Sequence, residues 1–459
     1  MRKSSAFILA AAFLSGACSL TPPLGKVDSQ ISARFPGKTG GTVSADIAWQ
    51  KFFADPRLRK LVETALANNR DLRIATLNVE QARAQYAISS SELFPPVNAF
   101  ASGERRRGVG QPGSNSSSIT TGSYDVSVGL VSYELDLFGR VRSLNSAALE
   151  TYFATDAARV GAQIALVAQV ANQYLAERAL QEQIALAQQT YDGMTQAYDI
   201  MKKRFDTGTV SELDLSSMEI QRQTAKADLA TFQQRSREIN NSLAFLAGGS
   251  LPAGLPNGRS LDEVVVAELK AGASSDLLYR RPDIREAEYQ LRAANANIGA
   301  ARAAFFPSVT LTATGGTASR SLSQLFASGT ATWLFAPDVN IPIFDGGRNQ
   351  ANLESAEIGK KIGIAKYEKS IQTGFREVAD SLAARSGFAE RITATEALVA
   401  AQQKRTDLAT ARYDKGVDSY FEVLNATLDL FAARQRLIQL RLARAVNSVE
   451  LYKALGGGW

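Results

Sequence analysis

The sequence predicts a membrane protein of mixed α and β structure that contains two copies of one structural unit. Three observations predict this fold class: a turn motif that occurs twice, helical segments of unusual length, and four segments that alternate apolar and polar residues. The hydrophobic fraction of 45% is typical of a folded protein.

The turn motif places arginine, an aromatic residue, aspartate and glycine at matching positions in the two halves of the chain. Its copies run from Arg204 to Gly208 and from Arg412 to Gly416. Self-similarity of this kind is typical of an internal repeat. The expected divisions are repeat 1 (49–249), a connector (250–280) and repeat 2 (281–459).

The N-terminal segment has the features of an export signal. Basic residues precede a short apolar run and then small residues before Cys18, the only cysteine of the chain. A cysteine at this junction predicts lipidation of a new N-terminus, because a free thiol is unusual in an oxidising compartment. Ordinary cleavage before Cys18 is the alternative. The expected segments are a signal peptide (1–17) and a lipid-anchored, extended tether (18–48).

Repeat 1 is expected to hold two strands between helices. One helix begins at Asp55-Pro56, since proline suits the first helical turn, and another runs from Asp71 to Phe94 before Pro95. The remaining elements are strands at about 97–104 and 123–137 and helices at 140–205 and 212–246.

The long helix of repeat 1 carries a coiled-coil seam, because apolar residues from Leu180 to Phe205 alternate in spacings of four and three. The aromatic residues Tyr191, Tyr198 and Phe205 could form a ligand site, but packing between helices is the favoured interpretation. At about 1.5 Å per residue, the longest helices reach roughly 100 Å. Such rods suit a wall or a tube.

Repeat 2 restarts the same pattern. Arg281-Pro282-Asp283 opens a helix, and Phe344 to Arg348 launches the second long helix as Phe138 to Arg140 launches the first. The expected elements are helix 284–306, strands 308–316 and 332–343, helix 348–413 and helix 419–455.

The four strands alternate apolar and polar residues as the strands of membrane barrels do. A sheet in lipid cannot leave its edges unpaired, and about eight strands make the smallest usual barrel. Four strands per chain therefore cannot close alone, whereas three copies give twelve. A small soluble sheet beside a helical bundle is the alternative.

The composition argues against several kinds of chemistry. With no histidine and one cysteine, zinc sites, cysteine–histidine nucleophiles and disulfides are nearly excluded. The sequence has no phosphate-binding loop, HExxH motif or nucleophile elbow. We therefore expect no catalytic residue, no metal site, no cofactor and no enzymatic activity. The net charge of +6 is too small to indicate nucleic acid.

Short motifs spread over nearly the whole chain occur in a distinctive order. They are Trp49 with residues 55–58, residues 80–84, Phe94-Pro95, residues 133–140, residues 281–284, Phe306-Pro307 and the two glycine turns. In this order they resemble the outer membrane factor (TolC-like) family, and especially its lipoprotein branch, the outer-membrane channels of RND-type efflux pumps.

The resemblance implies a homotrimer with a twelve-stranded β-barrel in the bacterial outer membrane, continuous with a periplasmic barrel of coiled-coil helices. It implies a passive, tip-gated exit duct for drugs, other small molecules or metal ions. The implied partners are outer-membrane lipid, a periplasmic adaptor protein and an inner-membrane pump of the RND type. The exit duct of a type I protein secretion system is one alternative, and a structural coiled-coil lipoprotein without a pore is another.

The resemblance also places a periplasmic gate at the fifth, sixth and ninth positions after each turn glycine. These residues are Leu213, Asp214 and Ser217, and Phe421, Glu422 and Asn425. Many relatives carry an acid at the ninth position, where this chain has Ser217 and Asn425 instead. The charge of this gate therefore rests on Asp214 and Glu422. Threefold repetition would make each acid a ring that attracts cations. Favourable charge at a helix N-terminus is the alternative role.

The two turns are expected at the periplasmic tip, where they would contact the adaptor. The glycines should adopt a left-handed conformation, and the aspartates before them should form the turns. The arginines either pair with neighbouring acids or are solvated. The expected tip residues are Arg204, Asp206, Gly208, Arg412, Asp414, Gly416 and Asp418.

Overall fold

The computed structural model describes residues 19–25, 27, 31–32, 35, 47–108, 119–265 and 275–457. Cys18, the expected signal peptide and most of the expected tether lie outside the described residues. The chain forms two compact units, and each unit takes segments from both sequence repeats. Unit 1 comprises Met1–Asp28, Asn78–Thr155 and Glu286–Glu368; unit 2 comprises Ser29–Leu77, Asp156–Arg285 and Lys369–Trp459.

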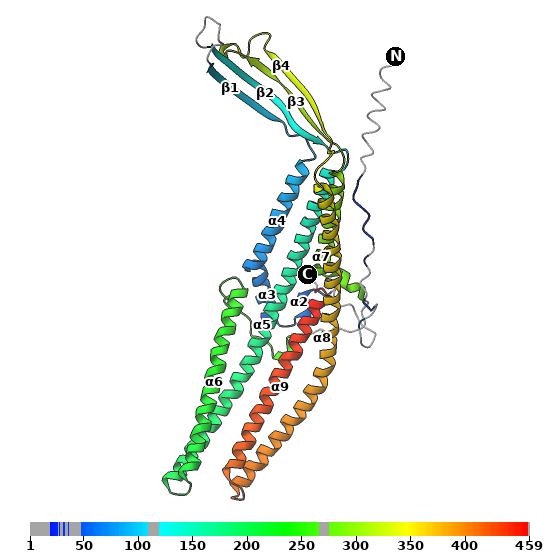
Figure 1. The fold of residues 1–459 in the computed structure, drawn as a ribbon. Coiled ribbons are helices and arrows are strands. Elements are labelled where there is room, and N and C mark those ends of the chain that lie inside the picture. Colours follow the sequence, from blue (N-terminus) through cyan, green and yellow to red (C-terminus); the bar gives the residue numbers. More distant parts are fainter. Residues whose placement is uncertain are drawn as a thin grey trace. The chain divides into compact units, whose positions relative to one another are not determined.

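Unit 1 contains one antiparallel sheet in the strand order β1-β2-β3-β4 (Figure 1). The strands are β1 (Asn98–Gly108), β2 (Ile119–Leu135), β3 (Ser308–Ser319) and β4 (Ala331–Asn340). Because β1 and β4 lie at the two ends of this order, each has one edge that no other described strand of the chain pairs. Among the described residues, the sheet is therefore open in the single chain.

The register places the alternating apolar residues on one face of the sheet. Val126 lies opposite Thr317, and Leu130 lies opposite Ala313, which in turn lies opposite Phe335. Successive side chains of a strand point to opposite faces, so a single register fixes both faces. The apolar face comprises Tyr124, Val126, Val128, Leu130, Val309, Leu311, Ala313, Trp333, Phe335 and Val339.

Several strand ends differ from the sequence-based expectation. β1 was expected to end at 104 but continues to Gly108, because backbone pairing with β2 holds it to the Gly108–Ile119 pair. β4 ends at Asn340 rather than 343, since Pro342 cannot donate to a ladder. β2 covers 119–135 rather than 123–137; the Asp136 carboxylate then accepts hydrogen bonds from the N–H groups of Val141 and Arg142.

The helices close to the sheet in unit 1 include α7 (Pro282–Ala303) and the first part of α8 (Arg348–Asp414). α7 begins two residues before the expected start at 284 and ends three residues before the expected end at 306. Leu291 of α7 packs directly against Gly363 of α8. Residues 20–22 of the expected tether lie against α7, where the Asn295 amide donates to the Pro22 carbonyl at 2.8 Å.

Unit 2 is helical and contains two antiparallel helix pairs (Figure 1). The first pair is α5 (Arg140–Asp206) with α6 (Glu212–Leu246), and the second is α8 with α9 (Tyr420–Ala454). Short helices α2 (Trp49–Phe52) and α3 (Pro56–Asn68) precede α4 (Arg70–Ser91). No helix in the described part of the chain combines the length and apolarity needed to cross a bilayer.

In unit 2, Asn69 joins the end of α6 to the start of α4. Its amide group donates to the Leu246 carbonyl at 3.0 Å, and its side-chain oxygen accepts from the Leu72 N–H at 2.9 Å. Helix ends leave carbonyl and N–H groups without intrahelical partners, and Asn69 serves one of each. One buried side chain therefore connects two helices end to end.

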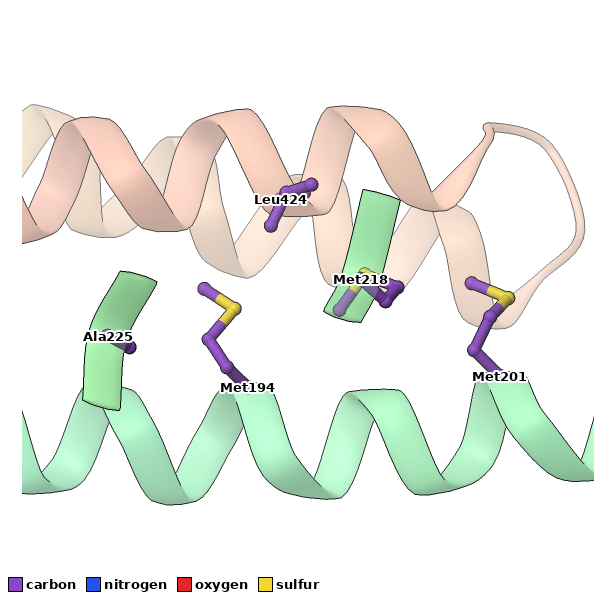
Figure 2. Packing of buried hydrophobic residues seen from close by; sticks show 5 residues of the cluster. All are labelled: Met194, Met201, Met218, Ala225 and Leu424. Carbon is purple, nitrogen blue, oxygen red and sulfur yellow. The ribbon is translucent and has the colours of Figure 1, made fainter. Parts of the chain in front are cut away.

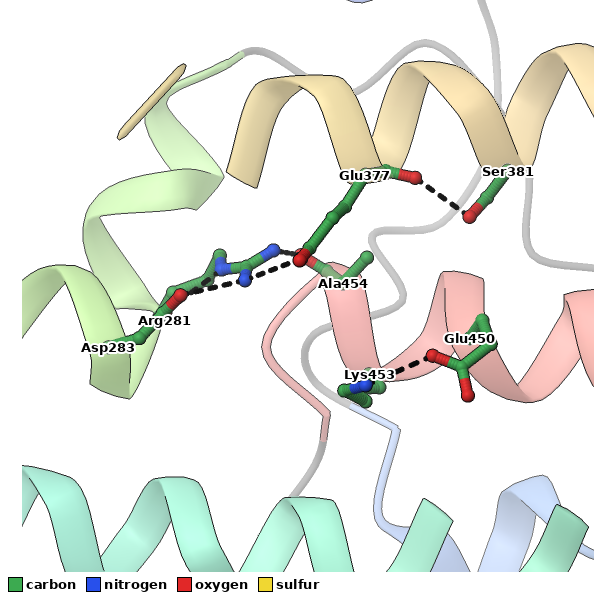
Figure 3. A network of polar contacts seen from close by, with 7 residues as sticks. All are labelled: Arg281, Asp283, Glu377, Ser381, Glu450, Lys453 and Ala454. Carbon is green, nitrogen blue, oxygen red and sulfur yellow. Dashed lines mark hydrogen bonds and ion pairs between the residues drawn. The ribbon is translucent and has the colours of Figure 1, made fainter. Parts of the chain in front are cut away.

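In repeat 2, Arg281 likewise connects the end of α9 to the start of α7 (Figure 3). Its guanidinium donates to the Ala454 carbonyl at 2.8 Å and to the carboxylates of Asp283 and Glu377 at 2.8 Å each. Burial opposes the positive charge, but these carboxylates outweigh it and raise the pKa of Arg281. The Arg281 guanidinium thus links α9, α7 and α8 at one point.

We predict that Arg281→Ala lowers the free energy of unfolding by about 2 kcal/mol, because a buried carbonyl loses its donor and two acids lose their partner. Circular dichroism during denaturation in detergent measures this loss. Lys60→Ala is the matched control, since its ion pair with Glu63 is more than half exposed and should contribute under about 1 kcal/mol. Equal losses for the two variants would contradict the role of Arg281.

Candidate functional site

The two repeated turns have the same backbone geometry. The Gly208 N–H donates to the Phe205 carbonyl and the Thr209 N–H to the Arg204 carbonyl; the second turn repeats both bonds from Gly416 and Val417. This pattern is the Schellman motif, which requires a left-handed residue after the helix. Gly208 and Gly416 have φ values of 72° and 70°, which confirms the expected left-handed conformation.

The segments after the two turns start their helices in different ways. In the first hairpin, Ser211 and Asp214 form a capping box: the Asp214 N–H donates to the Ser211 hydroxyl and the Ser211 N–H to the Asp214 carboxylate. In the second, Ser419 makes no side-chain cap, and Arg412 bonds the Asp418 carboxylate instead. This pair lowers the pKa of Asp418, chiefly through the hydrogen bond from Arg412.

The two hairpins contact each other at their turns. The Arg204 guanidinium donates to the Tyr413 hydroxyl. The Cζ atom of Arg204 lies 5.2 Å from the centre of the Tyr413 ring. Tyr413 in turn packs edge-to-face on Tyr420 at 5.0 Å. Of the two open roles for the arginines, Arg412 pairs with an acid, whereas Arg204 binds an aromatic side chain of the other hairpin.

A methionine-rich core lies directly behind the turns (Figure 2). Met194 and Met201 of α5 and Met218 of α6 are buried together with Leu424 of α9. Tyr191 and Tyr198 pack against this cluster, which confirms helix packing as the role of those two aromatics. Unbranched thioether side chains fill irregular gaps and tolerate rearrangement, so this core can repack without a large loss.

The expected gate residues occupy the first two turns of α6 and α9. Leu213 and Phe421 are 76% and 61% exposed in the single chain. Asp214 serves the capping box, and the Ser217 hydroxyl donates to the Leu213 carbonyl. Glu422 lies 4.0 Å from Arg405, while Asn425 is half-buried. The helix-terminal role of Asp214 is therefore present in the structure.

Near the turns, the expected aspartates are exposed, and an ion pair that was not expected joins α8 to α9. Asp206 and Asp414 are exposed and are the last residues of α5 and α8. Arg405, which the sequence reasoning missed, pairs with Asp429 at 2.5 Å. A signal was available, because Arg405 and Asp429 lie at similar distances on either side of Gly416 and must meet in an antiparallel hairpin.

Alanine at Gly208 or Gly416 should lower stability by about 1 kcal/mol, because an L-residue pays for the left-handed conformation. Gly193→Ala is the matched control: Gly193 lies inside α5 with open space around it, so the same substitution should stabilise by roughly 0.5–1 kcal/mol. Thermal denaturation of the three variants gives the signs. A stabilised Gly208→Ala variant would contradict the turn geometry.

Comparison with known proteins gives the family. The model of the outer membrane efflux protein family matches residues 61–249 and 273–457. The chain belongs to the outer membrane efflux protein family. This membership confirms the predicted resemblance and the prediction of an outer-membrane efflux duct that extends into the periplasm.

Individual relatives of this efflux family match over almost their whole length. The toluene efflux pump outer membrane protein TtgC of Pseudomonas putida is 45% identical over 100% of this chain and 96% of its own. The cation efflux system protein CusC of Escherichia coli O157:H7 is 41% identical over 96% of both chains. The solved open state of the Neisseria gonorrhoeae MtrE outer membrane channel is 38% identical, covers 96% of this chain and 98% of its own, and has a TM-score of 0.89.

Proposed function

We propose that three copies of this chain form a passive outer-membrane exit duct that conducts small molecules or metal ions delivered by an efflux pump. The observation that carries the proposal is the four-stranded sheet, with one apolar face and two edges that no other described strand pairs. Pairing β1 of one copy with β4 of the next would leave no edge exposed to lipid, as a membrane sheet requires.

The duct would do no chemistry of its own. Relatives are named for toluene, solvent and cation efflux, which supports small apolar molecules and metal ions as the substrate class. A periplasmic adaptor and an inner-membrane pump of the RND type would supply the substrate and the energy. Deletion of this chain should cause sensitivity to solvents, drugs or metal ions. Loss of an exported protein without such sensitivity would instead favour a secretion duct.

The adaptor would bind the two turns. The turns expose charged side chains next to backbone that is fixed by the left-handed glycines. The Arg204–Tyr413 contact joins the two hairpins, and the Arg405 ion pairs join α8 to α9 within the second hairpin. Opening therefore requires a partner that binds a different arrangement more tightly than this one. The proposed contact residues are Arg204, Asp206, Gly208, Arg412, Asp414, Gly416 and Asp418.

The gate would be formed by the first turns of α6 and α9. Leu213 and Phe421 supply exposed apolar side chains, and Asp214 and Glu422 supply carboxylates that three copies turn into rings. Ser217 and Asn425 would complete the constriction as polar, uncharged members. Because Asp214 also caps α6, Glu422 offers the cleaner test of charge at the gate.

We predict that Glu422→Gln lowers the cation-over-anion permeability ratio of the purified channel in planar bilayers by about twofold, since the substitution removes one carboxylate ring. Glu63→Gln makes the same charge change on α3 and should leave the ratio unchanged. Absence of conductance in every variant, including the double variant of Glu422→Ala and Asp214→Ala, would contradict a duct and favour a structural lipoprotein.

We further propose that Cys18 carries a lipid anchor, supported by its place after the export signal as the only cysteine. Mass spectrometry of the mature N-terminus tests this. An unmodified Cys18, or a chain that begins elsewhere, would contradict it.

A further inference from the structure

Three consecutive arginines, Arg105, Arg106 and Arg107, lie near the end of β1. This end of the sheet holds the last pair of the β1–β2 ladder, Gly108 with Ile119. The opposite end joins the helices, because β2 ends at Leu135 shortly before α5 begins at Arg140. In an outer-membrane channel whose helices extend into the periplasm, the arginines therefore lie at the outer end of the strand.

The strand alternation separates these arginines onto two faces. Arg106 shares the polar face with Glu104, and the two side chains form an ion pair at 3.5 Å. Arg105 and Arg107 share the other face, which is the apolar one, since Gly103 lies opposite Tyr124 and Arg105 opposite Gly122. Two positive charges therefore stand at the outer end of the lipid-facing surface.

The depth of these two arginines follows from the length of the apolar face. From Leu135 to Tyr124, β2 rises roughly 36 Å at about 3.3 Å per residue. At a tilt of about 40°, this span covers roughly 28 Å, close to the apolar band of about 25 Å in outer-membrane barrels. Arg105 and Arg107 then lie about 5 and 10 Å beyond the Tyr124 level, where lipid headgroups begin.

The neighbours of Arg105 on this face place an aromatic ring next to the arginine's strand position. Gly122, directly opposite, has no side chain, and the Tyr124 ring lies across the positions of Gly103 and Gly122. A Cβ atom at Gly103 or Gly122 would come within 3.1 Å or 3.3 Å of that ring. An aromatic ring at the boundary followed by basic residues is the arrangement found where membrane proteins meet the headgroup layer.

We propose that Arg105 and Arg107 bind the phosphate groups of a phosphorylated glycolipid in the outer leaflet. Positive charge on a lipid-facing surface is unfavourable at depth but becomes favourable beside an anionic headgroup. Guanidinium groups bind phosphate oxygens through two parallel hydrogen bonds. Pairing of β1 with another copy uses backbone groups, so both side chains stay on the lipid-facing surface.

The test measures binding of lipid A with two phosphates to the full-length protein in detergent, by native mass spectrometry. Arg105→Gln and Arg107→Gln should each weaken binding roughly fivefold. Arg106→Gln is the matched control, because it removes the same charge from the other face of the same strand, and it should change binding less than about twofold. The double variant of Arg105→Lys and Arg107→Lys, which keeps the charge, should bind more tightly than the double glutamine variant.

A second arm needs no variant and so does not depend on correct folding of a mutant. The unaltered protein should bind dephosphorylated lipid A more weakly than the lipid with two phosphates. Equal binding of the two lipids would overturn the proposal, as would an equal effect of Arg106→Gln. Displacement of the lipid by inorganic phosphate at matching concentration would also overturn it, because the site would then be one for free phosphate.

Discussion

The helical part of the protein depends on two junctions at which the end of one helix meets the start of another. These junctions join α6 to α4 and α9 to α7. Each junction buries helix ends, whose carbonyl and N–H groups would otherwise lack partners. Asn69 solves this with one amide that serves both helices, and Arg281 with a guanidinium fork that also reaches α8. Because a buried backbone group without a partner costs about as much as several surface contacts provide, these two side chains fix where the helices meet.

The turns combine a rigid backbone with an adaptable interior. The Schellman bonds and left-handed glycines define the backbone of each turn, whereas the methionine side chains behind them are unbranched and adaptable. The hairpins are joined by the exposed pair of Arg204 with Tyr413 and by Leu424 of α9 within the methionine cluster. Exposed pairs of this kind contribute little stability, so a partner of modest affinity can replace them.

The sheet shows how one strand register can supply several surfaces at once. Its apolar face suits lipid, and its polar face carries the Glu104–Arg106 pair. Its two outer edges, which no other strand of the described residues pairs, suit pairing with further copies. The consecutive arginines illustrate the consequence of a period of two, because neighbouring residues of one charge fall on opposite faces. Arg105 and Arg107 thus lie on the apolar face of the sheet, and Arg106 lies on the polar face.

The sequence by itself determined the order of elements, the two turns and the composition of the sheet faces. These features depend on local backbone chemistry: Gly208 and Gly416 end helices, Pro56 starts one, and alternation defines a strand face. Only the tertiary structure decided that β1 continues to Gly108, that Arg204 binds Tyr413, and that Asn69 and Arg281 join helices. Each of these depends on a partner distant in the sequence, and no local pattern encodes which distant group will be adjacent.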